Sequence, residues 1–135
     1  MRTVDRSVPI TLDKSYELRF TRQDVKAIEG ALGVGYTHFT RPAILGSVTA
    51  LEVYLWRGLY QENEKGELIH VFPATDEGKE QAGDLLWSFM TAGGDTPTLI
   101  DQIIDGFCLI GICKRRTPET PKEEPSQDAP KNLPA

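Results

Sequence analysis

The sequence predicts a mostly α-helical α+β fold, in which an N-terminal β-hairpin packs on a bundle of three to four short helices. Three observations support this prediction. Apolar residues alternate over residues 8–20, apolar residues recur every three or four positions in the later segments, and helix-starting and helix-stopping residues stand at the ends of those segments. We therefore expect one compact domain over residues 1–116.

The hairpin is predicted from the segment VPITLDKSYELRF, in which apolar and polar residues alternate on both sides of Asp13 and Lys14. The apolar positions are Val8, Ile10, Leu12, Tyr16, Leu18 and Phe20. This pattern is typical of two strands joined by a tight turn, with one apolar face. Because an isolated hairpin is only marginally stable, we expect that face to lie on the helices that follow.

Two helices are predicted in the first half of the chain. The first covers about residues 22–32, because Thr21 is a suitable N-cap and Gly33 supplies a left-handed stop. Ser47 is the expected N-cap of the second, whose apolar residues fall on one face until about Gln61. Its central position and aromatic content predict that this helix forms the middle of the core.

Two more helices are predicted in the second half. Thr75 is the expected cap of one, which ends before Gly93, and Thr96 followed by Pro97 opens the other. Between the second and third helices, the turn NEKGEL leads into ELIHVF, residues 67–72, which is short and β-branched enough for a strand or an extended arm.

The C-terminal segment, residues 117–135, has a different composition. It contains five prolines, and Leu133 is its only large aliphatic residue. Such a segment buries too little apolar surface to offset the entropy lost on ordering, so we predict a disordered tail.

The net charge of −5 argues against nucleic acid as a partner, because a polyanion is repelled on average. The one dense basic run, residues 114–116, stands at the predicted end of a helix, where cations are favoured by the helix dipole. The N-terminus lacks the apolar run of a signal peptide, and no window approaches the roughly 20 apolar residues of a membrane span. We therefore expect no membrane association.

No metal site or cofactor is predicted. A zinc site needs about four ligands, whereas the chain has two cysteines, Cys108 and Cys113, and two separated histidines, His38 and His70. On a continuous helix the five-residue offset would turn the two thiols about 140° apart, so they would not bridge unless the helix unwound. We interpret them as small, buried, reduced thiols.

No catalytic pattern is visible either, because neither histidine has a neighbouring nucleophile and acid. His70 is expected to be an ordinary strand residue. The chain is therefore predicted to be a non-enzymatic protein that binds another protein.

Partner contacts are expected from large residues at the edges of the apolar helix faces, where Trp and Tyr often anchor interfaces. The residues chosen on this ground are Tyr54, Trp56, Trp87, Phe107 and Ile110. Packing in the core is the alternative for each of the aromatic residues.

The order of these features resembles the small tail assembly chaperones of long-tailed bacteriophages and their counterparts in bacterial gene transfer agents. The matching stretches are YELRFT, DVKAIEGALG, VTALEVYLWRGL, GDLLWSFM and TLIDQIIDGF, which together extend over roughly residues 8–113. The resemblance implies a chaperone in the host cell cytoplasm. Such a chaperone would bind the long tape measure protein and help bring tail tube subunits to it.

Two other functions stay open. A structural virion protein of the tail, such as a connector or minor tube component, would assemble into closed rings and self-associate. A small regulatory DNA-binding domain would bind duplex DNA in a salt-dependent way, which the net charge disfavours.

Overall fold

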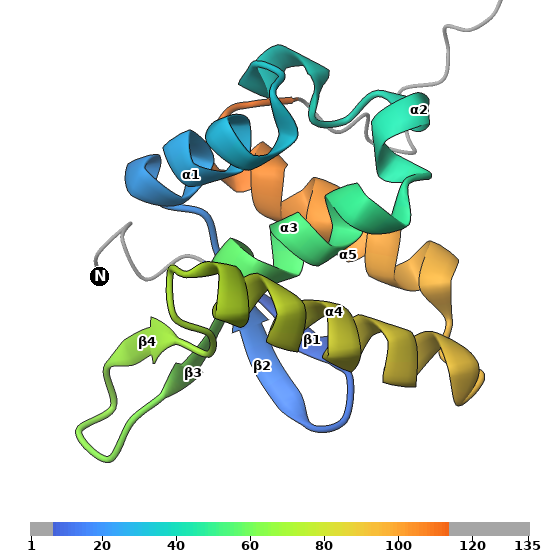
Figure 1. Ribbon diagram of the computed structural model, residues 1–135. Coiled ribbons are helices and arrows are strands. Elements are labelled where there is room, and N and C mark those ends of the chain that lie inside the picture. Colours follow the sequence, from blue (N-terminus) through green and yellow to red (C-terminus); the bar gives the residue numbers. More distant parts are fainter. Residues whose placement is uncertain (1–6, 114–135) are drawn as a thin grey trace, which may run out of the picture.

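The computed structural model describes residues 7–113, which form a four-stranded sheet and a group of helices. Figure 1 shows the sheet beside the helices. The strands are β1 (Val8–Thr11), β2 (Ser15–Leu18), β3 (Leu59–Glu62) and β4 (Leu68–His70). The helices are α1 (Arg22–Leu32), α2 (Pro42–Leu45), α3 (Val48–Gly58), α4 (Asp76–Thr91) and α5 (Thr96–Leu109), with a 3-10 turn at Tyr36–His38. The predicted α+β class is confirmed. The predicted tail, residues 117–135, and the domain limit at residue 116 lie outside the described residues.

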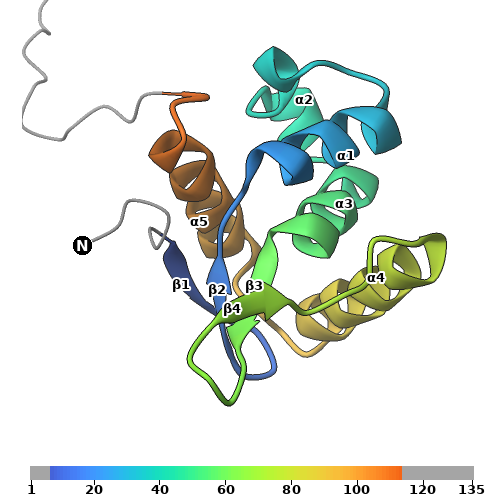
Figure 2. The same ribbon diagram turned by 90° about the vertical axis from the view of Figure 1, so that its left-hand side faces the viewer.

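The N-terminal hairpin forms as its alternation predicts. β1 and β2 pair antiparallel, with Val8 opposite Leu18 and Thr11 opposite Ser15. The side chains of Ile10, Tyr16 and Leu18 enter the core from this hairpin. Figure 2 shows α5 lying beside β1 and β2, and contacts of α5 with both strands agree with the view.

The second helix is shorter than predicted, because it ends at Gly58 and the chain continues directly as β3. β3 pairs with β2 on one side and with β4 on the other, so the sheet has the order β1-β2-β3-β4. Gly58 allows this close approach to the hairpin: a Cβ there would stand 2.6 Å from the ring of Phe20. The strand prediction for ELIHVF is confirmed over Leu68–His70.

Three of the four predicted helix caps are confirmed. The hydroxyls of Thr21, Ser47 and Thr75 accept hydrogen bonds from backbone N–H groups in the first turns of α1, α3 and α4. The fourth is wrong by one residue, because the carboxylate of Asp95 accepts from the N–H of Thr98 and Thr96 is already helical. An Asp at the N-cap satisfies the same orphan donor as a Thr.

The last helix also ends before the second cysteine, Cys113. α5 ends at Leu109, and Gly111 adopts the left-handed conformation with φ 84°. The helical offset that would separate the two thiols is therefore absent, and Cys108 Sγ lies 2.7 Å from Cys113 Sγ. Both residues are partly exposed, which corrects the prediction that they are buried.

α3 occupies the centre of the molecule. It contacts α1 and α4, and it leads into the sheet through β3 (Figure 1). Most of its residues are buried, and they are Ala50, Leu51, Val53, Tyr54, Leu55, Trp56, Arg57 and Gly58. No helix within residues 7–113 is long and apolar enough to cross a membrane.

Candidate functional site

Two of the five predicted partner-binding residues, Tyr54 and Phe107, lie in the centre of the core. Both are fully buried, and the ring of Phe107 stacks on Phe20 with 4.2 Å between centroids. Tyr54 meets Phe107 edge to face, and its hydroxyl donates to the carbonyl of Phe39 at 2.7 Å. Neither side chain can reach a partner in this fold, so the prediction of partner contact is wrong for both.

Trp56 is the third predicted residue that is buried, with 6% of its surface exposed. Its indole N–H donates to the carbonyl of Pro73 at 2.8 Å, and the cations of Arg57 and Lys79 lie over its ring. Edge positions on α3 are not surface positions, because α1 and α4 cover this helix. The indole instead anchors the loop that leads into α4.

Trp87 and Ile110 are the two predicted residues that are exposed, at 59% and 44%. Trp87 lies on α4, whereas Ile110 follows the end of α5. The two side chains line different depressions, with no lining residue in common. The structure therefore does not bring them together into one site.

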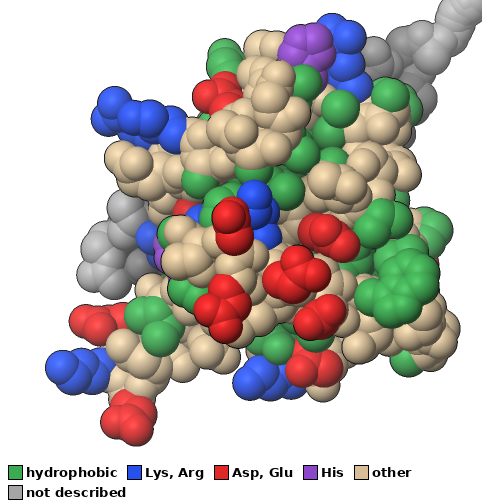
Figure 3. All heavy atoms as spheres, in the orientation of Figure 1, with side chains coloured by type: hydrophobic (Ala, Val, Ile, Leu, Met, Phe, Trp, Pro, Cys, Tyr) green, Lys and Arg blue, Asp and Glu red, His purple; other side chains and the backbone are tan. Residues whose placement is uncertain are grey.

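The depression at Trp87 is strongly acidic. It has a volume of about 240 Å³ and is lined by Glu52, Glu80, Gly83, Asp84 and Trp87, which we call the Trp87 surface. Figure 3 shows acidic side chains gathered in the middle of this face of the molecule, with an exposed hydrophobic area beside them. Burial raises the pKa of Glu52, and the nearby charges of Glu80 and Asp84 raise it further. The surface thus concentrates negative charge next to an exposed indole.

Two elements build the Trp87 surface. Glu80, Asp84 and Trp87 follow one another at spacings of four and three residues, so they share the outer face of α4. Glu52 comes from α3, and it fits because Gly83 has no side chain: a Cβ there would stand 2.9 Å from the Glu52 carboxyl group. The helix spacing is visible in the sequence, but the contribution of Glu52 is not.

The depression at Ile110 is more open and less acidic. It has a volume of about 610 Å³ between α1 and the end of α5, and its apolar lining includes Val25, Tyr36, Ile110 and Ile112. Arg22 and Lys26 contribute cations to its lining, and Glu29 contributes one carboxylate.

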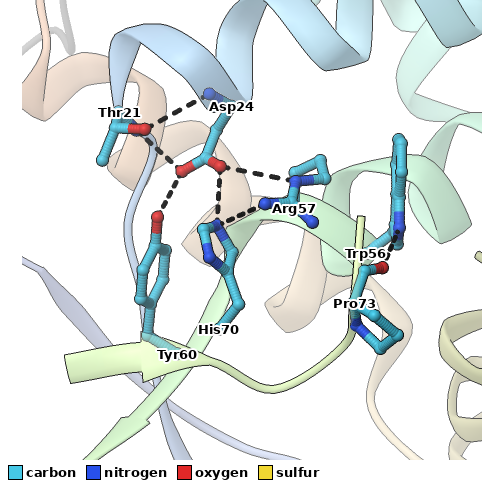
Figure 4. A network of polar contacts seen from close by, with 7 residues as sticks. All are labelled: Thr21, Asp24, Trp56, Arg57, Tyr60, His70 and Pro73. Carbon is cyan, nitrogen blue, oxygen red and sulfur yellow. Dashed lines mark hydrogen bonds and ion pairs between the residues drawn. The ribbon is translucent and has the colours of Figure 1, made fainter. Parts of the chain in front are cut away.

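A buried polar network joins α1, α3 and the β3–β4 hairpin, and sequence reasoning missed it (Figure 4). The carboxylate of Asp24 accepts from the backbone N–H of Thr21 at 2.9 Å and from the hydroxyl of Tyr60 at 2.5 Å. Its other oxygen lies 2.7 Å from His70 Nε2 and 3.4 Å from Arg57 Nε. Nothing local in the sequence marks the distant partners of Asp24.

The electrostatics of this network favour an ionised Asp24. Burial alone would raise its pKa, but the hydrogen bonds from His70, Tyr60 and the Thr21 N–H outweigh burial and lower the pKa. Burial and the bond to Asp24 raise the pKa of Tyr60, which keeps its hydroxyl protonated as a donor.

His70 Nε2 also lies 2.7 Å from Arg57 Nη2. A ring nitrogen holds at most one proton, and the bond to the ionised Asp24 requires that proton on Nε2, so Nε2 does not also accept from Arg57. Figure 4 shows the side chains of Arg57, Tyr60 and His70 directed toward Asp24 from α3, β3 and β4. The network therefore connects these elements to α1, and His70 is more than the ordinary strand residue predicted from the sequence.

Across residues 7–113, no group of three or more His, Cys, Asp or Glu side chains is placed to hold a metal ion. A scan against models of protein families, a search of curated proteins and a search of solved structures each found no match.

Proposed function

We propose that this chain is a non-enzymatic tail assembly chaperone of a long-tailed bacteriophage, which binds the tape measure protein and helps to recruit tail tube subunits. The Trp87 surface is the observation that supports binding. The resemblance of the sequence, from the hairpin to the last helix, supplies the identity of the partner.

An exposed tryptophan on a rigid helix is a suitable anchor for a protein partner. Trp is among the residues that most often dominate the energy of an interface, because it buries a large rigid area on binding. Trp87 stands on a helix whose other face packs on α3, so its position is fixed in advance. Little conformational entropy is therefore lost at Trp87 when a partner binds.

The carboxylates around Trp87 define the chemistry of the partner. A segment that presents Lys or Arg next to apolar side chains complements Glu52, Glu80 and Asp84 while it covers the indole. An amphipathic helix of a long tape measure protein can supply such segments repeatedly. Weak contacts repeated along one client give avidity, and each can still be displaced singly by a tube subunit.

The test is co-expression of this chain with the tape measure protein of the same tail gene cluster, followed by measurement of the soluble complex. We expect the wild-type chain to keep the client soluble. Trp87→Ala should lower recovery of the complex roughly tenfold or more, the effect of losing an interface anchor.

Ile69→Ala is the matched control, because Ile69 is also an exposed large apolar residue but lies on β4, away from the Trp87 surface. It should leave recovery unchanged. Thermal unfolding of both variants should match the wild type, since neither side chain is in the core. An insoluble client beside the wild-type chain, or equal losses in the two variants, would contradict the proposal.

A further inference from the structure

The two cysteines of the chain form a close pair at the end of α5. Cys108 Sγ lies 2.7 Å from Cys113 Sγ, and Cys113 Sγ is also 3.8 Å from the carbonyl oxygen of Ile104. Two sulfur atoms at this separation are inside the distance of ordinary contact and need only a small movement to reach bonding distance. Both residues are partly exposed, so a small reagent has access to them.

The backbone that follows α5 produces this pairing. The N–H of Gly111 donates to the carbonyl of Cys108 at 3.1 Å, and the N–H of Ile112 donates to Phe107 at 3.1 Å. Gly111, at φ 84°, reverses the chain so that residue 113 returns to the last turn of the helix. The turn therefore holds the thiols together before any bond forms.

We infer that Cys108 and Cys113 are an oxidation site, which forms an intrachain disulfide with a small disulfide oxidant such as oxidised glutathione. One cysteine thiolate attacks a glutathione sulfur, which forms a mixed disulfide and releases one glutathione thiolate. The second cysteine thiolate then attacks the cysteine sulfur of that mixed disulfide and releases the second glutathione. The protein loses two protons and two electrons, and the oxidant becomes two molecules of glutathione.

A bond between Cys108 and Cys113 would fix the turn between them, which carries Ile110. Ile110 and Ile112 line the depression against α1, so oxidation rigidifies that wall and leaves the Trp87 surface on α4 untouched. The oxidation site does not depend on the proposed chaperone function.

The experiment equilibrates the full chain in glutathione buffers of graded ratio, blocks the remaining thiols by alkylation and measures the mass. Because the chain has two cysteines, loss of two hydrogen atoms without a glutathione adduct identifies this bond. Both cysteines fall in one tryptic peptide, residues 80–114, which allows direct assignment. We expect half-oxidation at a ratio of [GSH]²/[GSSG] of about 1 mM or higher, the effective concentration of closely tethered groups.

Gly111→Ala tests the role of the turn, because it strains the left-handed position while leaving both thiols in place. We expect Gly111→Ala to lower the [GSH]²/[GSSG] ratio at half-oxidation by roughly fivefold to tenfold. Gly93→Ala is the matched control: Gly93 also has a positive φ, of 87°, with no neighbour within 4 Å of an added Cβ, but it lies between α4 and α5. It should leave the ratio unchanged.

Cys108→Ser and Cys113→Ser should each accumulate one glutathione adduct and no intrachain disulfide. The inference is overturned if the wild-type chain collects separate adducts on both cysteines, stays reduced at ratios below about 1 mM, or responds equally to Gly111→Ala and Gly93→Ala.

Discussion

Asp24, in α1, links three elements through one carboxylate, which contacts Thr21 at the N-cap of α1, Tyr60 in β3 and His70 in β4. A carboxylate that is buried without such donors would be protonated instead. Here the donors lower its pKa, so the folded protein binds fewer protons at this site than the unfolded chain does. The ionised form therefore contributes to stability at every pH above the unfolded pKa, near 3.9, and the contribution disappears as the pH falls through the lower folded pKa.

Asp24→Asn should lower the free energy of unfolding by about 3 kcal/mol near neutral pH, because it leaves Arg57 buried without its opposite charge. Urea unfolding measures the change. The difference from the wild type should shrink as the pH falls below the unfolded pKa, near 3.9, and through the lower folded pKa, because Asp24 itself then becomes protonated. Glu64→Gln, which removes one exposed carboxylate, is the control and should lower the free energy of unfolding by less than about 0.5 kcal/mol. If the effect of Asp24→Asn does not change with pH, Asp24 is not ionised in the folded protein.

At the scale of elements, the start of α4 is held against the loop that precedes it. A Cβ on Gly78 would stand 2.0 Å from the carbonyl oxygen of Pro73, which is a backbone atom and cannot turn away. The same carbonyl accepts the indole N–H of Trp56, so the loop is fixed from α3 as well. α3 and α4 are thus joined at a point where only glycine fits.

Gly78→Ala should therefore destabilise the fold by about 2 to 3 kcal/mol, since the loop or the helix must shift. Gly30→Ala is the matched control. Gly30 lies within α1 with no neighbour within 4 Å of an added Cβ, so alanine should stabilise the protein by up to about 1 kcal/mol. Chemical denaturation measures the change in the free energy of unfolding for both variants. If Gly78→Ala leaves that free energy unchanged, the loop is not fixed.

The elements that sequence reasoning found are those with local signals. The caps at Thr21, Ser47 and Thr75 depend on a side chain and a backbone group three residues away, and the first hairpin depends on alternation across one turn. β3 was missed because LYQE continues a helical apolar pattern and becomes a strand only through pairing with β2 and β4.

For the whole molecule, the chaperone proposal and the rival of a ring-forming tail protein differ in assembly state. We expect the 15.0 kDa chain to scatter light as a monomer or a loose, concentration-dependent multimer when no client is present. The acidic Trp87 surface disfavours a two-fold dimer through this face, because two copies facing each other there would place like charges together. A stable closed ring at low micromolar concentration would instead favour a connector or minor tube component.

The sequence by itself determined the α+β class, the N-terminal hairpin and three of the four helix caps, but it did not separate the exposed Trp87 and Ile110 from the buried residues chosen with them. Only the tertiary structure decided that Tyr54, Trp56 and Phe107 are enclosed, that Glu52 joins the acids of α4, and that Asp24 meets Tyr60 and His70. The physical reason is the distance along the sequence over which each interaction acts. Caps and turns act over a few residues, whereas burial of a helix edge or pairing of distant charges depends on which elements pack on it, as α1 and α4 do on α3.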